Sequence, residues 1–262
     1  MREITDQLGR VISLSGPPER IVSIVPSQTE LLYSLGLDKE VIGITRFCVH
    51  PRQWFRSKTR IGGTKKLDME KIKNINPDLV IANKEENTKS QVEELAAIFP
   101  VWISNIVTLD DATAMISSLG SICNREKEAG MIVTQIEDGF LEFPVKARDK
   151  KVAYLIWKEP YMTVNDKTFI HDMIRRCGLV NVFENSTARY PETSLAEIQS
   201  LDPDYVFLSS EPYPFREKHK KEMEAAFPAS RIILVDGEMF SWYGSRLIKS
   251  AGYLVNLLNT LN

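Results

Sequence analysis

The sequence predicts an α/β protein with two Rossmann-like lobes, each built on a parallel sheet, joined by a single long α-helix. Strand-like and helix-like segments alternate in both halves of the 262 residues, a pattern typical of parallel sheets that helices cover on both faces. Residues 68–81 also recur as 194–207, each copy with a helix-capping residue, a short amphipathic helix, a Pro-Asp pair and an apolar strand. The alternative is that these are two unrelated helix-strand joints.

A long helical pattern separates the two alternating halves. Apolar residues lie at helical spacing from about Glu126 to Phe143, and roughly 18 residues at about 1.5 Å each would form a rod of about 27 Å. Such a rod can join two lobes and, because a continuous helix has no flexible hinge, should keep them nearly rigid. The expected domains are an N-terminal lobe (1–124), a linking helix (125–148) and a C-terminal lobe (149–262).

The N-terminal lobe should begin with a hairpin over Ile4–Leu14 and a buried strand over Arg20–Val25. A helix follows at once, for which Ser27 or Thr29 can serve as the cap and Gly36 as the end. The remaining elements predicted for this lobe are strands at 41–44, 79–82 and 101–103 and helices at 68–76, 89–98 and 110–123.

The C-terminal lobe repeats the alternation of strand and helix. Its predicted strands are 152–157, 205–209 and 232–235. Its predicted helices are 169–177, 194–201, 216–227 and 243–261.

The composition excludes several classes of protein. Lys plus Arg number 33 against 35 Asp plus Glu, so no overall basic field exists to hold nucleic acid. No apolar run approaches the ~20 residues of a membrane span, and the first residues lack the pattern of a signal peptide. The three widely spaced cysteines argue against a disulfide framework. We expect a monomer with a small-molecule partner, no nucleic-acid partner and no cofactor, and the compartment stays open.

Unusual residues gather in the loops that follow the predicted strands. In open parallel sheets ligands bind beyond the carboxyl ends of the strands, and aromatic side chains with a few charged groups suit a cleft for a large, partly apolar ligand. Packing is the alternative role for Trp157, and helix capping for Ser27. The candidate ligand residues from these loops are Ser27, Gln28, Phe47, Asn83, Glu85, Trp157, Tyr161, Glu211, Tyr213, Phe240, Trp242, Tyr243 and Arg246.

Two other functions remain open from the residues alone. The motifs of serine hydrolases, dinucleotide-binding proteins and P-loop proteins are absent, but Cys48 and His50, with Glu85, could serve a cytosolic enzyme. His50 and His219 could instead bind a bare metal ion, although no pair of histidines has the spacing of a known metal motif.

The segments 20–32, 62–64 and 76–81, together with the long helix, resemble the helix-hinged solute-binding proteins of ABC importers, above all the members that bind cobalamin. The resemblance covers the chain from about residue 20 to its end. It implies two lobes that hold a metal chelate between them, delivery to a membrane permease, no catalysis, and a periplasmic or extracytoplasmic location. The implied ligand is a corrinoid such as cobalamin, with haem and a ferric siderophore as alternatives.

The resemblance also implies roles for particular residues. Cobalamin-binding members dock on permease arginines through one glutamate in each lobe, and Glu70 occupies the first of these positions. In the second copy Ala196 stands at the matching offset, and Glu197, one residue later, is either a docking charge or part of a capping box with Ser194. Phe47 and Tyr190 fall where these members carry aromatic residues, whereas Thr64 and Asn83 replace tryptophans. Tyr190, Thr64 and the adjoining Lys65 therefore join the candidate ligand residues.

Overall fold

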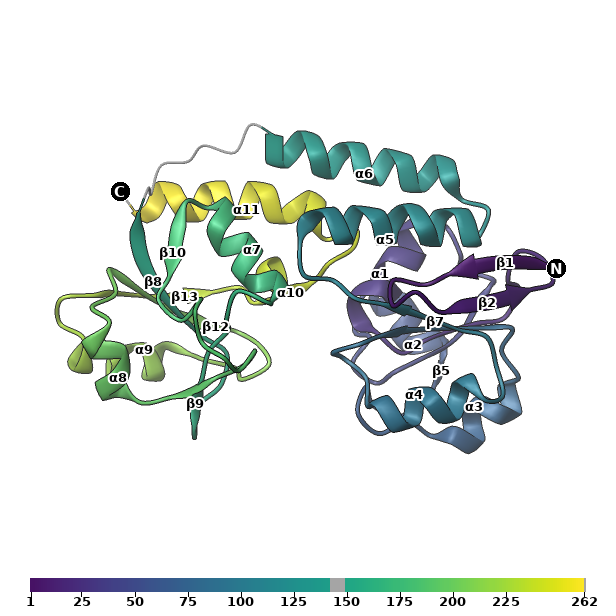
Figure 1. The fold of residues 1–262 in the computed structure, drawn as a ribbon, viewed down its shortest axis with the longest axis horizontal. Coiled ribbons are helices and arrows are strands. Elements are labelled where there is room, and N and C mark those ends of the chain that lie inside the picture. Colours follow the sequence, from purple (N-terminus) through teal and green to yellow (C-terminus); the bar gives the residue numbers. More distant parts are fainter. Residues whose placement is uncertain (142–148, 262) are drawn as a thin grey trace. The chain divides into compact units, whose positions relative to one another are not determined.

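The computed structural model describes residues 1–141 and 149–261, and the chain divides into two compact units. Unit 1 comprises Met1–Ile106, Asp110–Glu137 and Tyr243–Leu247, and unit 2 comprises Val107–Leu109, Asp138–Trp242 and Ile248–Asn262. Each unit contains a parallel sheet with helices around it (Figure 1). The predicted fold class is therefore confirmed, while the limits predicted for the lobes and the linking helix stay a proposal.

Unit 1 is built on a five-stranded sheet in the order β5-β4-β3-β6-β7, in which every neighbouring pair is parallel. Its strands are β3 (Ile21–Ser23), β4 (Val41–Ile44), β5 (Thr59–Arg60), β6 (Leu79–Asn83) and β7 (Val101–Ser104). Its helices are α1 (Pro26–Ser34), α2 (Arg52–Ser57), α3 (Met69–Ile75), α4 (Lys89–Ala96) and α5 (Leu109–Ile122).

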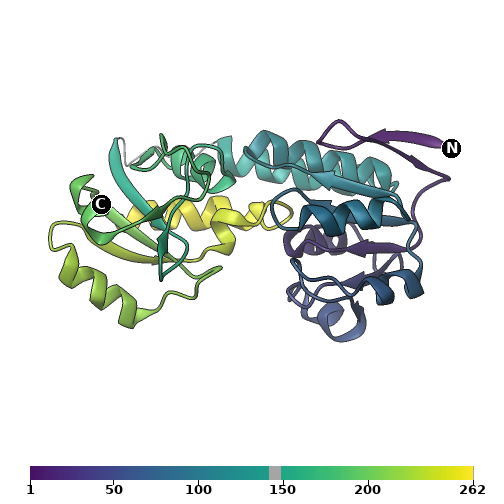
Figure 2. The same cartoon turned by 60° about the horizontal axis from the view of Figure 1, so that its bottom comes forward.

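An antiparallel hairpin of β1 (Arg2–Thr5) and β2 (Val11–Leu14) confirms the predicted N-terminal hairpin. It lies beside α5 in both views (Figures 1 and 2). The Arg2 side chain donates to the Ser121 carbonyl oxygen at 2.9 Å, and Gln7 donates to that of Asp111 at 2.9 Å. The hairpin is thereby attached to the helix as well as to the edge strand β7, whose Ile103 carbonyl accepts from the Gln7 amide.

Unit 2 is built on a four-stranded parallel sheet in the order β10-β8-β12-β13. Its strands are β8 (Lys150–Leu155), β10 (Leu179–Asn181), β12 (Tyr205–Ser209) and β13 (Arg231–Val235), and a separate antiparallel pair is formed by β9 (Tyr161–Met162) and β11 (Glu192–Thr193). Its helices are α7 (Phe169–Arg176), α8 (Leu195–Ser200), α9 (Glu217–Ala226), α10 (Glu238–Ser241) and α11 (Leu247–Leu261).

The long mid-chain helix α6 runs without a break from Glu126 to Leu141, and its residues are divided between unit 1 and unit 2 after Glu137. Its sixteen residues correspond to about 24 Å at the usual rise. The last two residues predicted for this helix, and the rest of the predicted linking segment to residue 148, lie outside the described part of the chain.

The central strands are buried along their whole length, which explains their continuous apolar sequences. Every residue of β3, β6 and β12 is buried, as expected for parallel strands covered on both faces. In unit 2 the residues Ala153, Leu155, Val206 and Leu208 are fully buried and form the centre of one apolar cluster. Removing this much apolar surface from water is the main stabilising contribution to the sheet.

The internal repeat is structural and extends to hydrogen-bond detail. Asp68 and Ser194 cap α3 and α8 by accepting from the backbone amides of Lys71 and Glu197. Helix α3 ends at Asn76, which has a left-handed backbone with φ 42°, and the matching left-handed residue after α8 is Asp202 with φ 49°, one residue beyond the C-cap Leu201.

The aspartate of each Pro-Asp pair fastens its strand to the neighbouring strand. Asp78 accepts from the backbone amides of Glu19 and Arg20 at 2.8 and 2.9 Å, just before β3. Asp204 accepts from the amide of Lys151 in β8 at 2.8 Å. In both copies the aspartate of the Pro-Asp pair therefore aligns the starts of two neighbouring parallel strands.

Three features differ from the sequence-based predictions. Pro26 begins α1, so its cap is Val25, and neither Ser27 nor Thr29 acts as the cap. The last helix begins at Leu247 rather than at residue 243, after the separate short helix α10. The elements α2, β5, β9, β10 and β11 were not predicted, and each is only two to six residues long.

Replacing Asp78 with alanine should lower the free energy of unfolding by about 1–2 kcal/mol, because two backbone amides lose a charged acceptor. The measurement is urea unfolding followed by circular dichroism. Glu94→Ala, which removes an exposed carboxylate from α4, is the control and should change stability by less than about 0.5 kcal/mol. Equal effects of the two substitutions would contradict the role given to Asp78.

Candidate ligand-binding surfaces

At the carboxyl edge of the sheet in unit 1, buried amide groups meet one serine. The Gln28 side chain donates to the hydroxyl of Ser104, and the Asn83 Nδ2 donates to the same oxygen at 2.9 Å. The Ser104 hydroxyl in turn donates to the Ala82 carbonyl oxygen at 3.1 Å. All three side chains are at most 1% exposed. Gln28 and Asn83 therefore hold the ends of α1, β6 and β7 together, and we leave them and the buried Ser27 out of the proposed ligand contacts.

Two loops of unit 1 are also fastened to each other. The Asn83 Oδ1 accepts from the Glu85 and Glu86 amides at 2.8 and 3.1 Å, which shapes the turn after β6. The Lys65 ammonium group donates a hydrogen bond to the Glu85 carbonyl oxygen, and the Asn87 side chain donates one to the Thr64 carbonyl oxygen at 3.1 Å. The structure thus brings the candidate residues Thr64, Lys65 and Glu85 together at this edge.

Phe47 presents an exposed aromatic ring in unit 1. The side chain follows β4 and is 48% exposed, with the Arg46 guanidinium 5.0 Å from its ring centroid. Gly63 lies beside the ring, since a Cβ there would be 3.0 Å from a ring carbon. This glycine therefore allows the ring and the 62–66 loop to approach closely.

Cys48 is a structural residue rather than a nucleophile. Its side chain is fully buried, and the hydroxyls of Thr29 and Thr45 each lie 3.1 Å from its sulfur. Burial raises the pKa of the Cys48 thiol above its ordinary value, which the two threonines only partly offset. A neutral, inaccessible thiol cannot attack a substrate, so the pairing of Cys48 with His50 in an enzyme is not supported.

In unit 2 an aromatic cluster follows β8 and β12. The Trp157 and Tyr213 rings meet edge to face with centroids 5.7 Å apart, and Tyr213 lies 4.8 Å from Phe215 in the same way. Phe215 is buried, whereas Trp157 is 39% exposed. The cluster therefore has an apolar base and an exposed indole on top.

His219 holds this aromatic cluster in place. The Arg216 amide donates to its Nδ1 at 3.0 Å, so Nδ1 is an acceptor and the proton of the neutral ring is on Nε2. The Nε2–H faces the Tyr213 hydroxyl at 3.3 Å. Burial first, and then the charges of Lys218 and Lys158, lower the pKa of His219 below its ordinary value, and Glu222 opposes this. Because both ring nitrogens are engaged, His219 has none left for a metal ion.

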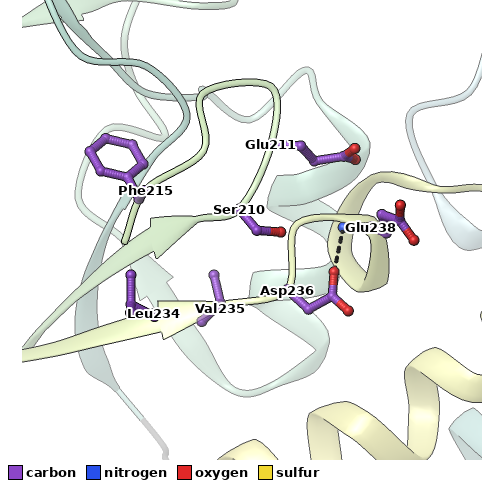
Figure 3. Close-up of a pocket in the computed structure, with 7 residues that line it drawn as sticks. All are labelled: Ser210, Glu211, Phe215, Leu234, Val235, Asp236 and Glu238. Carbon is purple, nitrogen blue, oxygen red and sulfur yellow. Dashed lines mark hydrogen bonds between the residues drawn. The ribbon is translucent and has the colours of Figure 1, made fainter. Parts of the chain in front are cut away.

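A hollow of about 520 Å³ lies at the carboxyl ends of β12 and β13 (Figure 3). Apolar side chains form one side, while three carboxylates lie on the other, and the Glu238 amide donates to Asp236 at 3.1 Å. Trp242 and Ser241 both donate to the Glu211 carboxylate, at 2.9 and 2.7 Å, which fixes its direction. The lining residues are Ser210, Glu211, Phe215, Leu234, Val235, Asp236 and Glu238.

Asp236, Glu238 and Ser210 are residues of this hollow that the sequence analysis did not select. Ser210 and Asp236 stand directly after β12 and β13, and Glu238 begins α10 two residues after Asp236, so the rule that ligands bind beyond the carboxyl ends of parallel strands points to them as well. Without the tertiary structure, nothing distinguishes them from ordinary solvent-exposed loop residues.

Four candidate residues of the loop after β13 are buried. Phe240 is fully buried and packs against Tyr154 at 5.1 Å between ring centroids. Arg246 is bound through two nitrogens to both oxygens of Glu30 at 2.8 Å each, so its charge is already paired. Trp242 and Tyr243 are 8% and 6% exposed. We therefore leave these four residues out of the proposed ligand contacts.

Tyr161 and Tyr190 lie on neighbouring segments of unit 2. Tyr161 is in β9, which pairs with β11 opposite Thr193, and the Pro191 carbonyl oxygen accepts from the Thr163 amide at 3.0 Å. Tyr190 is 37% exposed and Tyr161 is half-buried. Both remain proposed ligand contacts.

The two glutamates suggested for docking are exposed. Glu70 lies in the first turn of α3, with its side chain 78% exposed and 3.1 Å from the Lys73 ammonium. Glu197 accepts from Thr193 Oγ1 at 2.8 Å, while its own amide donates to Ser194. The structure thus shows only the Ser194 half of the predicted capping box, and the Glu197 carboxylate stays at the surface.

Within residues 1–141 and 149–261, no three His, Cys, Asp or Glu side chains are grouped so that they could hold a metal ion. Over the same residues, no helix has both the length and the apolar character that crossing a bilayer requires.

Comparison with protein families matches residues 21–232 to the periplasmic binding proteins. The chain belongs to this family. Among curated relatives, the vitamin B12-binding protein of Vibrio campbellii is 27% identical over 74% of this chain and 72% of its own length. That of Pectobacterium carotovorum subsp. carotovorum is 23% identical over 94% of this chain and 90% of its own.

Solved structures share the fold. The periplasmic vitamin B12-binding protein of Vibrio cholerae superposes with a TM-score of 0.80 at 20% identity, over 94% of this chain and 98% of that one. The periplasmic heme-binding protein from Roseiflexus sp. RS-1 gives a TM-score of 0.75 at 17% identity, over 93% and 97%. Proteins of this fold are thus named after different ligands, and the fold alone does not identify the ligand of this chain.

The thiols of the native protein should hardly react with Ellman's reagent at about pH 8, because the neutral thiol is a poor nucleophile. All three cysteines are free and buried, and burial raises the pKa of Cys123 and Cys177 to about 12. After unfolding in guanidinium, all three should react. Rapid labelling of Cys48 in the native protein would restore the enzyme hypothesis.

His219 should make the protein less stable as the pH falls from 7 to 5. Its folded-state pKa is lowered, so the unfolded chain takes up a proton at a higher pH, near 6.5, and stability is lost below that value. His219→Gln keeps an acceptor for the Arg216 amide but does not titrate. Urea unfolding across this range should show a smaller loss for the variant, and equal losses would contradict the assignment. His171, whose pKa is also lowered, is present in both proteins, so its contribution cancels when the two losses of stability are compared.

Proposed function

We propose that this protein is a non-catalytic solute-binding protein that captures a metal chelate, with a corrinoid as the first choice, and delivers it to an ABC permease. The observation that carries the proposal is the set of exposed or half-buried aromatic rings in the segments that follow the sheet strands, in a chain of this family. Flat aromatic faces suit a large, partly apolar ligand. Where the ligand lies relative to the two units stays a prediction. The aromatic residues concerned are Phe47, Trp157, Tyr161, Tyr190 and Tyr213.

The hollow of unit 2 favours a corrinoid over haem. Glu211, Asp236 and Glu238 line it, and carboxylates accept hydrogen bonds but repel other carboxylates. A corrin ring carries amide groups that donate hydrogen bonds, whereas a haem presents propionate groups. The vitamin B12-binding relatives support the same choice, and haem and ferric siderophores remain the alternatives.

The competing functions have less support. The enzyme hypothesis needs a reactive Cys48, which is buried and held by two threonines. The bare-metal hypothesis needs a free ring nitrogen on His219, and both nitrogens are engaged. A chelate brings its own metal coordination, so it requires neither group.

Glu70 and Glu197 are the proposed contacts with the permease. Both are exposed and lie in the first turn of equivalent helices in the two units. Exposed ion pairs are worth only about 0–1 kcal/mol each, so such contacts would mainly orient the protein on its partner. We propose this role together with a monomeric state and a periplasmic or extracytoplasmic location, and membership of the periplasmic binding protein family supports the location.

The proposal is tested by incubating the protein separately with cyanocobalamin, haemin and a ferric hydroxamate siderophore, desalting each mixture and recording the visible spectrum. Retained cobalamin colour is expected. Colour retained only with haemin or the siderophore would identify a different ligand and leave the proposed class of protein unchanged. Loss of all three colours, with no heat of binding in calorimetric titration, would contradict the proposal.

Trp157→Ala should weaken cobalamin binding about tenfold in calorimetric titration, because an aromatic contact contributes on the order of 1 kcal/mol beyond its buried area. The melting temperature should change little, since the indole is 39% exposed. Met131→Ala removes a similarly exposed apolar side chain from α6 and is the control. Loss of stability without loss of affinity would make Trp157 a packing residue.

A further inference from the structure

Positive charge is concentrated in one part of unit 1. Between Glu40 and Asp68 the sequence contains seven lysines and arginines and no carboxylate. The chain as a whole has a formal net charge of −2, so the residues outside this segment together carry −9. The basic residues of the segment are Arg46, Arg52, Arg56, Lys58, Arg60, Lys65 and Lys66.

Helix α2 and the edge strand β5 gather three of these arginines. Arg52 and Arg56 are both exposed and four residues apart, so they share one face of α2. Arg60 is exposed as well, and its guanidinium lies 5.0 Å from the ring centroid of Phe55 in that helix. We call Arg52, Arg56 and Arg60, with the neighbouring Val49, the α2 basic surface.

The helix itself is well anchored, so its outward charges do not serve to hold it. Trp54 is buried, meets Tyr33 at 5.3 Å between ring centroids and donates its Nε1–H to Asp38. Lys58 lies 3.7 Å from Asp38 and 5.1 Å from the centroid of the Trp54 ring. Lys58, the C-cap of α2, takes part in this anchoring, and Arg60 donates to the Phe55 carbonyl oxygen at 2.5 Å, whereas Arg52 and Arg56 do not contribute.

The charges of the α2 basic surface are not neutralised by the protein. In the described part of the chain, no carboxylate lies within salt-bridge distance of Arg52, Arg56 or Arg60. Val49, which precedes the helix, is 40% exposed. An exposed apolar side chain therefore lies three residues before Arg52 in the sequence.

We propose that the α2 basic surface binds the anionic headgroups of a phospholipid membrane. Guanidinium groups form paired hydrogen bonds with phosphate oxygens. Three of them on the outside of a helix and an edge strand, rather than converging in a buried cradle, fit an array of phosphates better than one small anion. Basic residues combined with an exposed apolar side chain are the features that hold a protein at a membrane interface.

The exposed valine favours a lipid surface over nucleic acid. A lipid interface can take up an apolar side chain, whereas a nucleic-acid backbone offers it only charge and water. Binding would keep the protein near the membrane without fixing it there, since each basic residue contributes about a fivefold increase in binding. This inference is independent of which ligand the protein carries.

The test is sedimentation of the full chain with vesicles of phosphatidylcholine alone or with about 30% phosphatidylglycerol, at about 50 mM salt, where surface charges are weakly screened. Binding is expected only to the anionic vesicles, and it should disappear at about 500 mM salt. Arg52→Gln with Arg56→Gln should reduce binding about 25-fold, with an unchanged melting temperature because neither side chain has an ion-pair partner within residues 1–141 and 149–261.

Lys218→Gln with Lys221→Gln is the matched control, since it removes two exposed charges from α9 in unit 2 and should leave vesicle binding within about twofold. An equal loss in both double variants would overturn the proposal, because binding would then depend on net charge alone. Equal binding to neutral vesicles would also overturn it. So would binding to duplex DNA as tight as binding to the anionic vesicles.

Discussion

Burial of the central strands on both faces is the constraint on which the rest of the molecule depends. Because every residue of β3, β6 and β12 is buried, polar groups can appear only where these strands end. The aspartates at positions 78 and 204 fix the starting points of the strands by accepting amides of the neighbouring chain segment. The opposite ends then carry the loops in which the aromatic and charged side chains gather, which is why the fold and the ligand surfaces cannot be separated.

The two units use their carboxyl edges differently. In unit 1 the amide nitrogens of Gln28 and Asn83 are directed at Ser104 and both side chains are buried, which leaves Phe47 as an exposed aromatic group of that edge. In unit 2 the carboxylate of Glu211 is oriented by Trp242 and lines an open hollow. Discrimination between ligands should therefore depend more on unit 2, whose polar groups are positioned but still accessible.

The sequence predicts the strands and the longer helices well, because continuous apolar runs and helical periodicity can be recognised without knowing which other segments pack against them. It could not predict α2, whose six residues bury only Trp54 and therefore show no stripe. The start of α1 was misplaced because Pro26, a favourable first residue of a helix, precedes the serine and threonine that looked like caps. Phe240 and Trp157 both stand at or beyond the carboxyl end of a predicted strand, and only tertiary packing makes one a core residue and the other a surface residue.

The burial of all three cysteines has a practical consequence for following this protein at work. A single cysteine introduced at an exposed position, such as that of Lys89 in α4, would be the one site open to a maleimide fluorophore. The native sulfur atoms would not compete for the dye, so they need not be replaced first. Ligand capture and arrival at a permease could then be observed on one labelled molecule that otherwise keeps its natural sequence.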